Sequence, residues 1–411
     1  MSLRICLVSS RFNVQSRASD RGALWPLARG LARRGHEVFA LSSRSPLGLP
    51  LVQRDGVSAY YVEEGKSTGS FSTLNDRLYQ QFEKLHSQKK FDIVHGLDAS
   101  AYRIARAKKT LKVKVAMDVE ATQMSQVLSI LGMQQETVGS LLTTGIAVSY
   151  KFLTTYFGRD RKLLRSTDGV FVTSPLQRVL LERYYLYPDQ HIFTVPYGLE
   201  MSPQPAQVNP EQVRTELGLP DKSQLTVTLS DMTELAELTH LLSAFEKVAI
   251  KKPQSFLLVI GNGPLFKQVE YEILNRALGS RVLLLGSLKD EEVQKYLRAS
   301  DIFINLSSRT TGFEPSLLEA MANKKVIIGS EIGPLSHVIE DGMDGFLLRP
   351  ADIESLTQLW LEIFSGSLGI QEMGERAQTK VKHLFDPEKM LDSLIQSYGK
   401  ILVKSDNYAS R

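Results

Sequence analysis

Short apolar runs alternate with longer amphipathic segments along most of the chain. Residues 3–10 are mostly apolar and end in small residues, which is typical of a strand buried on both faces of a parallel sheet. Residues 24–34 instead place apolar side chains at helical spacing, and Gly35 predicts the end of that helix. Strands and helices in alternation predict a doubly wound α/β fold. The predicted strands are 3–10, 37–43, 57–62, 91–96, 113–119 and 168–174 in the first half, and 225–230, 255–264, 281–287, 301–308, 325–330 and 345–350 in the second half.

The alternation is interrupted between the two halves. Residues 191–210 contain four prolines and show no period, so they predict an interdomain linker. A chain of 411 residues is also too long for one ordinary core. We therefore predict two Rossmann-like domains, 1–196 and 211–385, that face each other across a cleft. Ligands of open α/β sheets bind at the carboxyl ends of the strands, and candidate residues are sought there.

Composition narrows the class of protein without identifying it. Hydrophobic residues at 43% and charged residues at 23% are normal for a globular domain. The net charge of +4 suits an anionic ligand or a membrane surface, and it is too small to indicate binding to nucleic acid. The single cysteine, Cys6, lies in an apolar run and predicts a core residue, which fits the cytoplasm. The apolar part of the N-terminus is too short for a signal peptide.

The segment from Met124 to Arg165 is long, partly apolar and basic at its end. One interpretation is a helix that lies on a membrane surface. The alternative is a buried helix with a basic, solvated end. The two interpretations give two predicted locations, which are the cytoplasm alone or the cytoplasm with peripheral contact at the inner face of the membrane.

Glycine turns follow two predicted strands of the second domain. Gly261 and Gly263 end a buried strand and precede a helix, where glycine lets a ligand approach the backbone and a helix N-terminus favours an anion. The alternative is an ordinary strand-to-helix turn, which an isolated Gly-x-Gly favours. Gly286, after the next strand, is a weaker signal of the same kind.

A stronger signal lies in "RTTGFEPSLLEA", residues 309–320. Pro315 suits the first turn of a helix, so Ser316 and Leu317 offer free N–H groups there. Glu319 follows about one turn along, where a carboxylate can accept two hydroxyl bonds of the kind that a ribose offers. The alternative is that Glu319 is a solvated helix residue.

His95 follows a predicted strand and is expected at the ligand edge of the first sheet. It is a candidate base or phosphate ligand, although a lone histidine at a strand end is more often structural. The other histidines show no spacing typical of metal ligands, and no Asp-x-Asp pair exists to hold a divalent ion with a diphosphate. The sequence therefore predicts no metal site.

The order of these features resembles family 4 of the GT-B glycosyltransferases, which are retaining enzymes that use nucleotide sugars. The resemblance runs nearly end to end, and "FEPSLLEAMANKKVIIGSEIGPLSHVIEDGMDGFLLRP", residues 313–350, is its most specific part. Further segments that are similar to the family's landmarks are 91–98, 168–184, 192–200, 256–264, 282–288 and 385–403. The resemblance implies that a final helix, 386–405, crosses back to complete the first domain.

The resemblance also implies a nucleotide-sugar donor site in the second domain and an acceptor side in the first, with no metal and no cofactor. Glu319 would bind the ribose, backbone at 286–288 would hold the base, and residues 316–317 would approach the phosphates. The implied donor-binding residues are Gly261, Gly263, Gly286, Ser287, Leu288, Gly312, Phe313, Ser316, Leu317 and Glu319.

The chain departs from the family pattern where the donor's sugar and phosphates bind. Thr311 stands where the family has the first glutamate of its motif, eight positions before Glu319. The family's arginine and lysine, which neutralise the departing diphosphate, fall at Asp231 and Ala236, and residues 223–246 contain no Lys or Arg. Losing two hydrogen bonds to a charged group costs about 3–6 kcal/mol, or roughly 100-fold to 10⁴-fold in affinity.

Other residues are candidates for the missing chemistry. The candidate catalytic residues are His95, Glu120, Arg309 and Thr311, of which Glu120 falls at the position of a family histidine. The candidate substitutes for the missing cations are Arg309, Arg11, Arg17 and Arg21. The family's glycine pair before the first helix falls near Ala18 and Ser19.

Two hypotheses follow. In the first, the chain is an active, metal-independent, retaining glycosyltransferase with a rearranged phosphate site. In the second, it is a degenerate relative that binds a nucleotide or a protein partner, such as an active glycosyltransferase, and transfers nothing. Family resemblance favours the first and the altered phosphate site favours the second.

Overall fold

The computed structural model divides the chain into two compact units, which are Met1–Glu200 with Phe385–Arg411 (unit 1) and Met201–Leu384 (unit 2). The residues that it describes are 2–10, 12, 24–43, 45, 47–62, 71–119, 159–173, 175–198, 208–306, 315–331, 335, 338–366 and 368–403. Among these residues, no helix is both long and apolar enough to cross a membrane.

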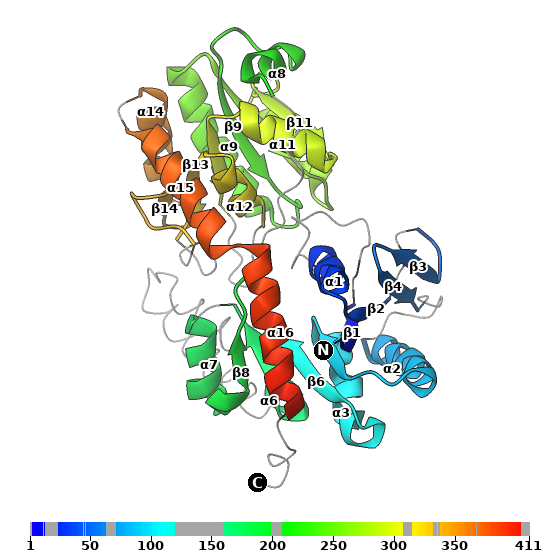
Figure 1. Ribbon diagram of the computed structural model, residues 1–411. Coiled ribbons are helices and arrows are strands. Elements are labelled where there is room, and N and C mark those ends of the chain that lie inside the picture. The colour runs from blue at the N-terminus through cyan, green and yellow to red at the C-terminus, as the bar shows by residue number, and fades with distance from the viewer. Residues whose placement is uncertain are drawn as a thin grey trace, which may run out of the picture. The chain divides into compact units, whose positions relative to one another are not determined.

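Unit 1 is built on an eight-stranded sheet (Figure 1). Its strands are β1 (Arg4–Val8), β2 (Glu37–Ser42), β3 (Leu51–Arg54), β4 (Val57–Tyr61), β5 (Ile93–Gly96), β6 (Lys114–Asp118), β7 (Gly169–Val172) and β8 (Ile192–Thr194). The strand order is β3-β4-β2-β1-β5-β6-β7-β8, and only the β3–β4 pair is antiparallel. The doubly wound parallel sheet predicted for this half is confirmed. The prediction succeeded because near-continuous apolar runs suit strands covered on both faces.

Two strands of unit 1 were not predicted. β3 buries one residue in four, so it shows no apolar run. β8 is three residues long and lies inside 191–210, the segment predicted to be linker. The prolines of that segment come after β8, so the interpretation as linker was wrong for residues 192–194. Residues 195–198 and 208–209, on either side of the undescribed 199–207, have no regular secondary structure.

The closing helix, α16 (Pro387–Val403), belongs to unit 1. Its apolar side chains enter the same core as α1 and the central strands, and Figure 1 shows it running beside the sheet. At Gly30 of α1 a Cβ atom would lie 2.6 Å from Leu391, so the glycine lets the two helices approach. Arg34 forms ion pairs with Glu388 and Asp392 of α16. The other helices are α1 (Leu24–Arg33), α2 (Phe71–Gln88), α3 (Tyr102–Leu111), α6 (Arg159–Ser166) and α7 (Pro175–Tyr185).

Unit 2 contains a six-stranded sheet, and all of its neighbouring strands are parallel. Its strands are β9 (Gln224–Leu229), β10 (Ser255–Ile260), β11 (Val282–Gly286), β12 (Ile302–Asn305), β13 (Val326–Ser330) and β14 (Phe346–Leu348), in the order β11-β10-β9-β12-β13-β14. Its helices are α8 (Pro210–Glu216), α9 (Leu235–Lys251), α10 (Phe266–Asn275), α11 (Asp290–Ala299), α12 (Pro315–Ala322), α14 (Ile353–Phe364) and α15 (Ile370–Leu384). The fully buried Trp360 of α14 packs on Phe245 of α9 and donates its indole N–H to Thr226 Oγ1 of β9 at 3.0 Å.

Each sheet has a point where the strand order reverses, beside β1 in unit 1 and beside β9 in unit 2. In unit 1, the loops after β1 and β5 are tied together there by Asp98. Its Oδ2 accepts hydrogen bonds from the backbone N–H and the hydroxyl of Ser10, both at 2.7 Å. Ligands of such folds bind at this place, so these loops and their counterparts in unit 2 position the candidate sites.

Candidate functional site

The loop after β9, residues 230–234, is closely folded. Ser230 Oγ accepts the N–H of Met232 at 3.0 Å, and Asp231 Oδ1 accepts the N–H of Thr233 at 3.2 Å and its hydroxyl at 2.8 Å. Met232 has a positive φ of 49° and is fully buried in the core of unit 2. Its carbonyl accepts the N–H of Leu265 at 3.1 Å. The loop is therefore held against the turn that follows β10.

That contact explains the two glycines of the turn. A Cβ atom at Gly261 would lie 1.8 Å from the carbonyl oxygen of Ser230, and one at Gly263 would lie 1.8 Å from that of Asp231. Both residues must therefore be glycine for the two loops to touch, with or without a ligand. Gly286 differs, because its φ of 67° favours glycine while nothing lies within 4 Å of its Cβ position. The prediction that these turns line a donor pocket stays a prediction.

The positions assigned to the family's two cations lie on this loop and the helix after it. Asp231 and Ala236 are both exposed, and the described first turn of α9 adds Glu237. Lys267, in the first turn of α10, is paired with Glu270 at 2.8 Å. In the described residues, the loop after β9 and the first turn of α9 therefore carry carboxylates and no cation, and the lysine of the neighbouring turn is paired.

Glu319 of α12 is buried, with 3% of the residue exposed. Its Oε2 accepts a hydrogen bond from Gln294 Nε2 of α11 at 3.1 Å. Asn323 Nδ2 in turn donates to Gln294 Oε1 and to the backbone oxygen of Glu319, both at 2.8 Å. The alternative of a solvated helix residue is wrong, because the residue is buried and its carboxylate is hydrogen-bonded to α11. Ser316 and Leu317 are also buried, at 6% and 2% exposed.

Several predicted residues lie outside the described ranges. These are Thr311, Arg309, Gly312, Phe313, Glu120, Arg11, Arg17, Arg21, Ala18, Ser19 and most of 124–165. Ser287 and Leu288 are described and follow Gly286 directly, with Ser287 exposed and Leu288 half-buried.

His95, at the end of β5, is 1% exposed and has both ring nitrogens engaged. Nδ1 lies 2.8 Å from the hydroxyl of Tyr398 on α16, and Nε2 lies 2.8 Å from Asp118 Oδ1 at the end of β6. Phe171 of β7 packs edge-on against the imidazole, with ring centroids 4.8 Å apart. The two hydrogen bonds thus join side chains from three elements, and two of these side chains, Asp118 and Tyr398, were not among the predicted site residues.

Beside this cluster lies a cavity of about 60 Å³. Its described lining includes His95, Asp118, Phe171, Thr173, Tyr197 and Met390. Asp118 had a signal in the sequence, because it ends a predicted parallel strand and so falls at the ligand edge of the sheet. Tyr398 had none, since its contact with His95 spans 303 residues of sequence.

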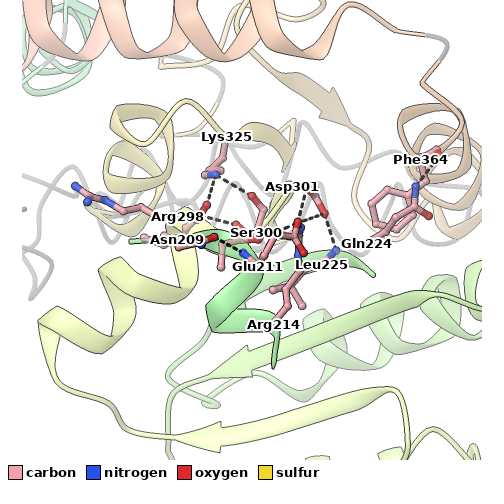
Figure 2. Close-up of polar contacts among 12 residues, drawn as sticks. Asn209, Glu211, Arg214, Gln224, Leu225, Arg298, Ser300, Asp301, Lys325 and Phe364 are labelled. Atoms are coloured by element: carbon pink, nitrogen blue, oxygen red, sulfur yellow. Dashed lines mark hydrogen bonds and ion pairs between the residues drawn. The ribbon is translucent and has the colours of Figure 1, made fainter. Parts of the chain in front are cut away.

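A second cluster of charges lies in unit 2, at the amino-terminal edge of its sheet, which is the edge opposite to the glycine turns (Figure 2). Asp301, just before β12, accepts the N–H of Leu225 at 2.7 Å and pairs with Arg214 of α8 at 3.0 Å. Lys325, just before β13, donates to the backbone oxygens of Arg298 and Ser300 at the end of α11, both at 2.8 Å. Burial raises the pKa of Asp301 and lowers that of Lys325 to about 8. Across the described residues, no three His, Cys, Asp or Glu side chains are grouped so as to hold a metal ion.

Comparisons with known proteins match this architecture. N-acetyl-alpha-D-glucosaminyl L-malate synthase of Bacillus anthracis is 24% identical over 392 residues, which are 93% of this chain and 93% of that protein. Sucrose-phosphate synthase from Thermosynechococcus elongatus has a similar structure, with a TM-score of 0.77 at 18% identity over 98% of this chain and 100% of that one. Anabaena HepE, solved with UDP and glucose, gives a TM-score of 0.74 at 14% identity over 97% and 99% of the two chains.

Two family descriptions match the chain in succession. "Glycosyl transferase 4-like domain" matches residues 23–198, and "Glycosyl transferases group 1" matches residues 209–380. Structures of this similarity show the fold, which is the GT-B fold that the sequence predicted. Because the two matches follow one another over nearly the whole chain and fall in its two units, the chain belongs to the group 1 glycosyltransferases of the GT-B fold.

Proposed function

We propose that the chain transfers a sugar from a nucleotide sugar to a hydroxyl group of a glycan, lipid or small-molecule acceptor, with retention and without a metal ion. The observation that carries this proposal is the placement of Glu319. Glu319 is a buried carboxylate on α12, the helix that follows β12, and it accepts a hydrogen bond from Gln294 of α11. Such a carboxylate suits the role of ribose ligand that the family resemblance implies.

The comparisons support the same class of donor and reaction. HepE, which shares the fold, was solved with UDP and glucose, and the Bacillus anthracis relative is named as a glucosaminyl malate synthase. In this chain the nucleoside would lie against the turns at 261–263 and 286–288, with its ribose at Glu319. Its phosphates would point toward residues 316–317.

A second function, nucleotide binding without sugar transfer, is favoured by one specific observation. A carboxylate, Asp231, stands in the loop after β9, and its hydrogen bonds to Thr233 hold the loop folded. Its Oδ1 is held by the N–H and hydroxyl of Thr233, while Ala236 has no charge to offer. A nucleotide-binding protein that transfers nothing, and that works as a scaffold or beside an active glycosyltransferase, would need no diphosphate cations.

One experiment separates the two functions. The full chain is incubated with a panel of UDP-, GDP- and ADP-sugars, with EDTA present, and binding is followed by calorimetry while donor hydrolysis is followed by NMR. Transfer predicts release of the nucleoside diphosphate from one donor, with the α-anomer of the free sugar formed first. A degenerate protein would bind a nucleotide and leave every donor intact. If neither binding nor hydrolysis occurs with any donor, both proposals are wrong.

A further inference from the structure

Three side chains from distant parts of unit 1 form one hydrogen-bonded series. Tyr398 of α16, His95 of β5 and Asp118 of β6 are linked by two contacts of 2.8 Å each. Tyr398 and His95 are almost fully buried, at 0% and 1% exposed, whereas the Asp118 side chain is 27% exposed. The series therefore leads from the core of the unit to a carboxylate at the ligand edge of its sheet.

The direction of the two hydrogen bonds follows from Asp118. A carboxylate oxygen only accepts, so His95 Nε2 donates its proton to Asp118 Oδ1. A neutral imidazole then presents the lone pair of Nδ1, and the Tyr398 hydroxyl donates to it. Burial raises the pKa of that hydroxyl well above 10, and the negative charge of Asp118 raises it further, so the phenol keeps the proton that it donates. One carboxylate oxygen of Asp118 is thus fixed by the fold.

The other carboxylate oxygen, Oδ2, accepts no hydrogen bond from any residue that the structure describes. Asp118 lines the cavity of about 60 Å³, and no lysine or arginine is among the described residues that line it. The rest of the lining is mostly apolar, with Leu27, Phe171 and Met390 among its members. A fixed carboxylate in such surroundings favours a ligand that donates a hydrogen bond next to C–H groups.

We propose that Asp118 binds a hydroxyl group of the acceptor through Oδ2, and that His95 and Tyr398 are positioning residues for its carboxylate. The ligand class is a neutral polyol, with a hydroxymethyl group in the cavity. An engineered cavity that admits benzene measures about 150 Å³, so the smaller volume here suits a substituent rather than a whole sugar ring. This inference rests on the proposed sugar transfer and identifies the side of the acceptor that unit 1 recognises.

The test compares two sugars that differ by one hydroxyl. D-glucose carries a hydroxymethyl group, and 6-deoxy-D-glucose carries a methyl group in its place. Their affinities for the full chain are measured by ligand-observed NMR. Because a hydrogen bond to a charged group is involved, D-glucose should bind about tenfold or more tightly. Asp118→Asn should reduce that preference, since the N–H of His95 directs the amide oxygen inward and leaves toward the ligand a neutral NH₂ group, which can only donate to the hydroxyl oxygen and forms no charged hydrogen bond.

The positioning role is tested with Tyr398→Phe, which removes only the hydroxyl. The preference for D-glucose should fall by a smaller factor than in Asp118→Asn, and the ¹⁵N shifts of His95 should change from the Nε2–H tautomer to a mixture. Tyr187→Phe is the matched control, because Tyr187 is also a buried tyrosine of unit 1 whose hydroxyl contacts Thr167 Oγ1 at 3.2 Å, away from the cavity. It should leave both measurements unchanged.

Equal affinity for the two sugars, no binding of either, or a preference as large in Asp118→Asn as in the native protein would overturn the inference. If the preference for D-glucose depends on Asp118 but the protein neither hydrolyses nor transfers any donor, the inference about Asp118 is upheld and the proposed function is wrong. Transfer that proceeds unchanged in Asp118→Asn, with equal binding of the two sugars, would do the reverse.

Discussion

The two edges of the unit 2 sheet carry opposite kinds of charge chemistry. At the amino-terminal edge, the cations Arg214 and Lys325 meet Asp301 and the backbone oxygens at the end of α11 (Figure 2). At the carboxyl-terminal edge, the loop after β9 carries Asp231 and no cation. Group 1 transferases bind their donor at the carboxyl edge of this sheet, as the family resemblance implies, so Arg214 and Lys325 lie away from the expected ligand.

The reason for this difference lies in the partners. Arg214 pairs with the carboxylates of Glu211 and Asp301, and Lys325 donates to two carbonyl oxygens, so both cations are already engaged within the fold. The Asp231 side chain closes its own turn through Thr233. The number of Lys and Arg residues in a sequence therefore does not indicate phosphate binding until the partners of each cation are known.

Restoring the cations at the carboxyl edge should have the largest effect. In the double variant Asp231→Arg, Ala236→Lys, UDP should gain about 2–5 kcal/mol of binding free energy relative to uridine. Two new cations would then donate hydrogen bonds to the diphosphate, while their long side chains lose rotamer entropy. Calorimetry on both ligands measures it.

The matched control for that double variant is Asp231→Asn, which keeps an oxygen for the turn at Thr233 and removes only the charge. It should raise the UDP preference much less. A native protein that already prefers UDP strongly would show that another cation serves the phosphates, and Arg309→Ala would be the next variant to measure.

Removing a carboxylate from the opposite edge should affect stability instead. Asp301→Ala leaves the N–H of Leu225 without its acceptor and removes one of the two carboxylates that pair with Arg214, which should lower the free energy of unfolding of unit 2 by about 2–3 kcal/mol. The expected loss of stability is smaller than for a fully buried ion pair, because 35% of the Asp301 side chain is exposed.

Urea unfolding measures this loss through the fluorescence of Trp360, in a Trp25→Phe background so that unit 2 is followed by itself. The matched control is Asp221→Ala, at an exposed turn of the same unit. Equal unfolding midpoints for the two variants would mean that the Asp301 cluster contributes nothing.

Glu319→Ala should weaken nucleotide binding by about 1.5–3 kcal/mol, as expected for the loss of a charged acceptor. The affinity for uridine should fall as much as that for UDP, because the ribose is common to both. Glu362→Ala, on α14, is the control with the same chemical change. Unchanged calorimetric affinity in Glu319→Ala would place the nucleoside elsewhere.

The sequence predicted the fold well because its strands are apolar runs that a parallel sheet buries on both faces. It missed β3 and β8, since an exposed edge strand and a three-residue strand leave almost no pattern. At the sites it selected Glu319 and His95 from local spacing, but it missed Gln294 and Tyr398, which reach them from other helices. Such partners are set by packing between distant segments, which periodicity does not encode.

The smallest expected effect concerns Lys325 and the pH. Burial lowers the pKa of Lys325 to about 8 in the folded chain, whereas an unfolded lysine titrates near its ordinary value of 10.5. Between these values the unfolded state binds more protons, so this group's contribution to stability rises with pH there and is lost as pH falls through about 8.

From about pH 7 to about pH 9, the native protein should gain about 1 kcal/mol of unfolding free energy relative to Lys325→Met, in which the group is absent. Lys324→Met is the control, because it makes the same chemical change at an exposed neighbouring ammonium, which is paired with Glu375 at 3.5 Å. Parallel pH profiles for the native protein and Lys325→Met would mean that the carbonyl oxygens of Arg298 and Ser300 hold the ammonium charged, and that this edge of the sheet keeps a full cation in its interior.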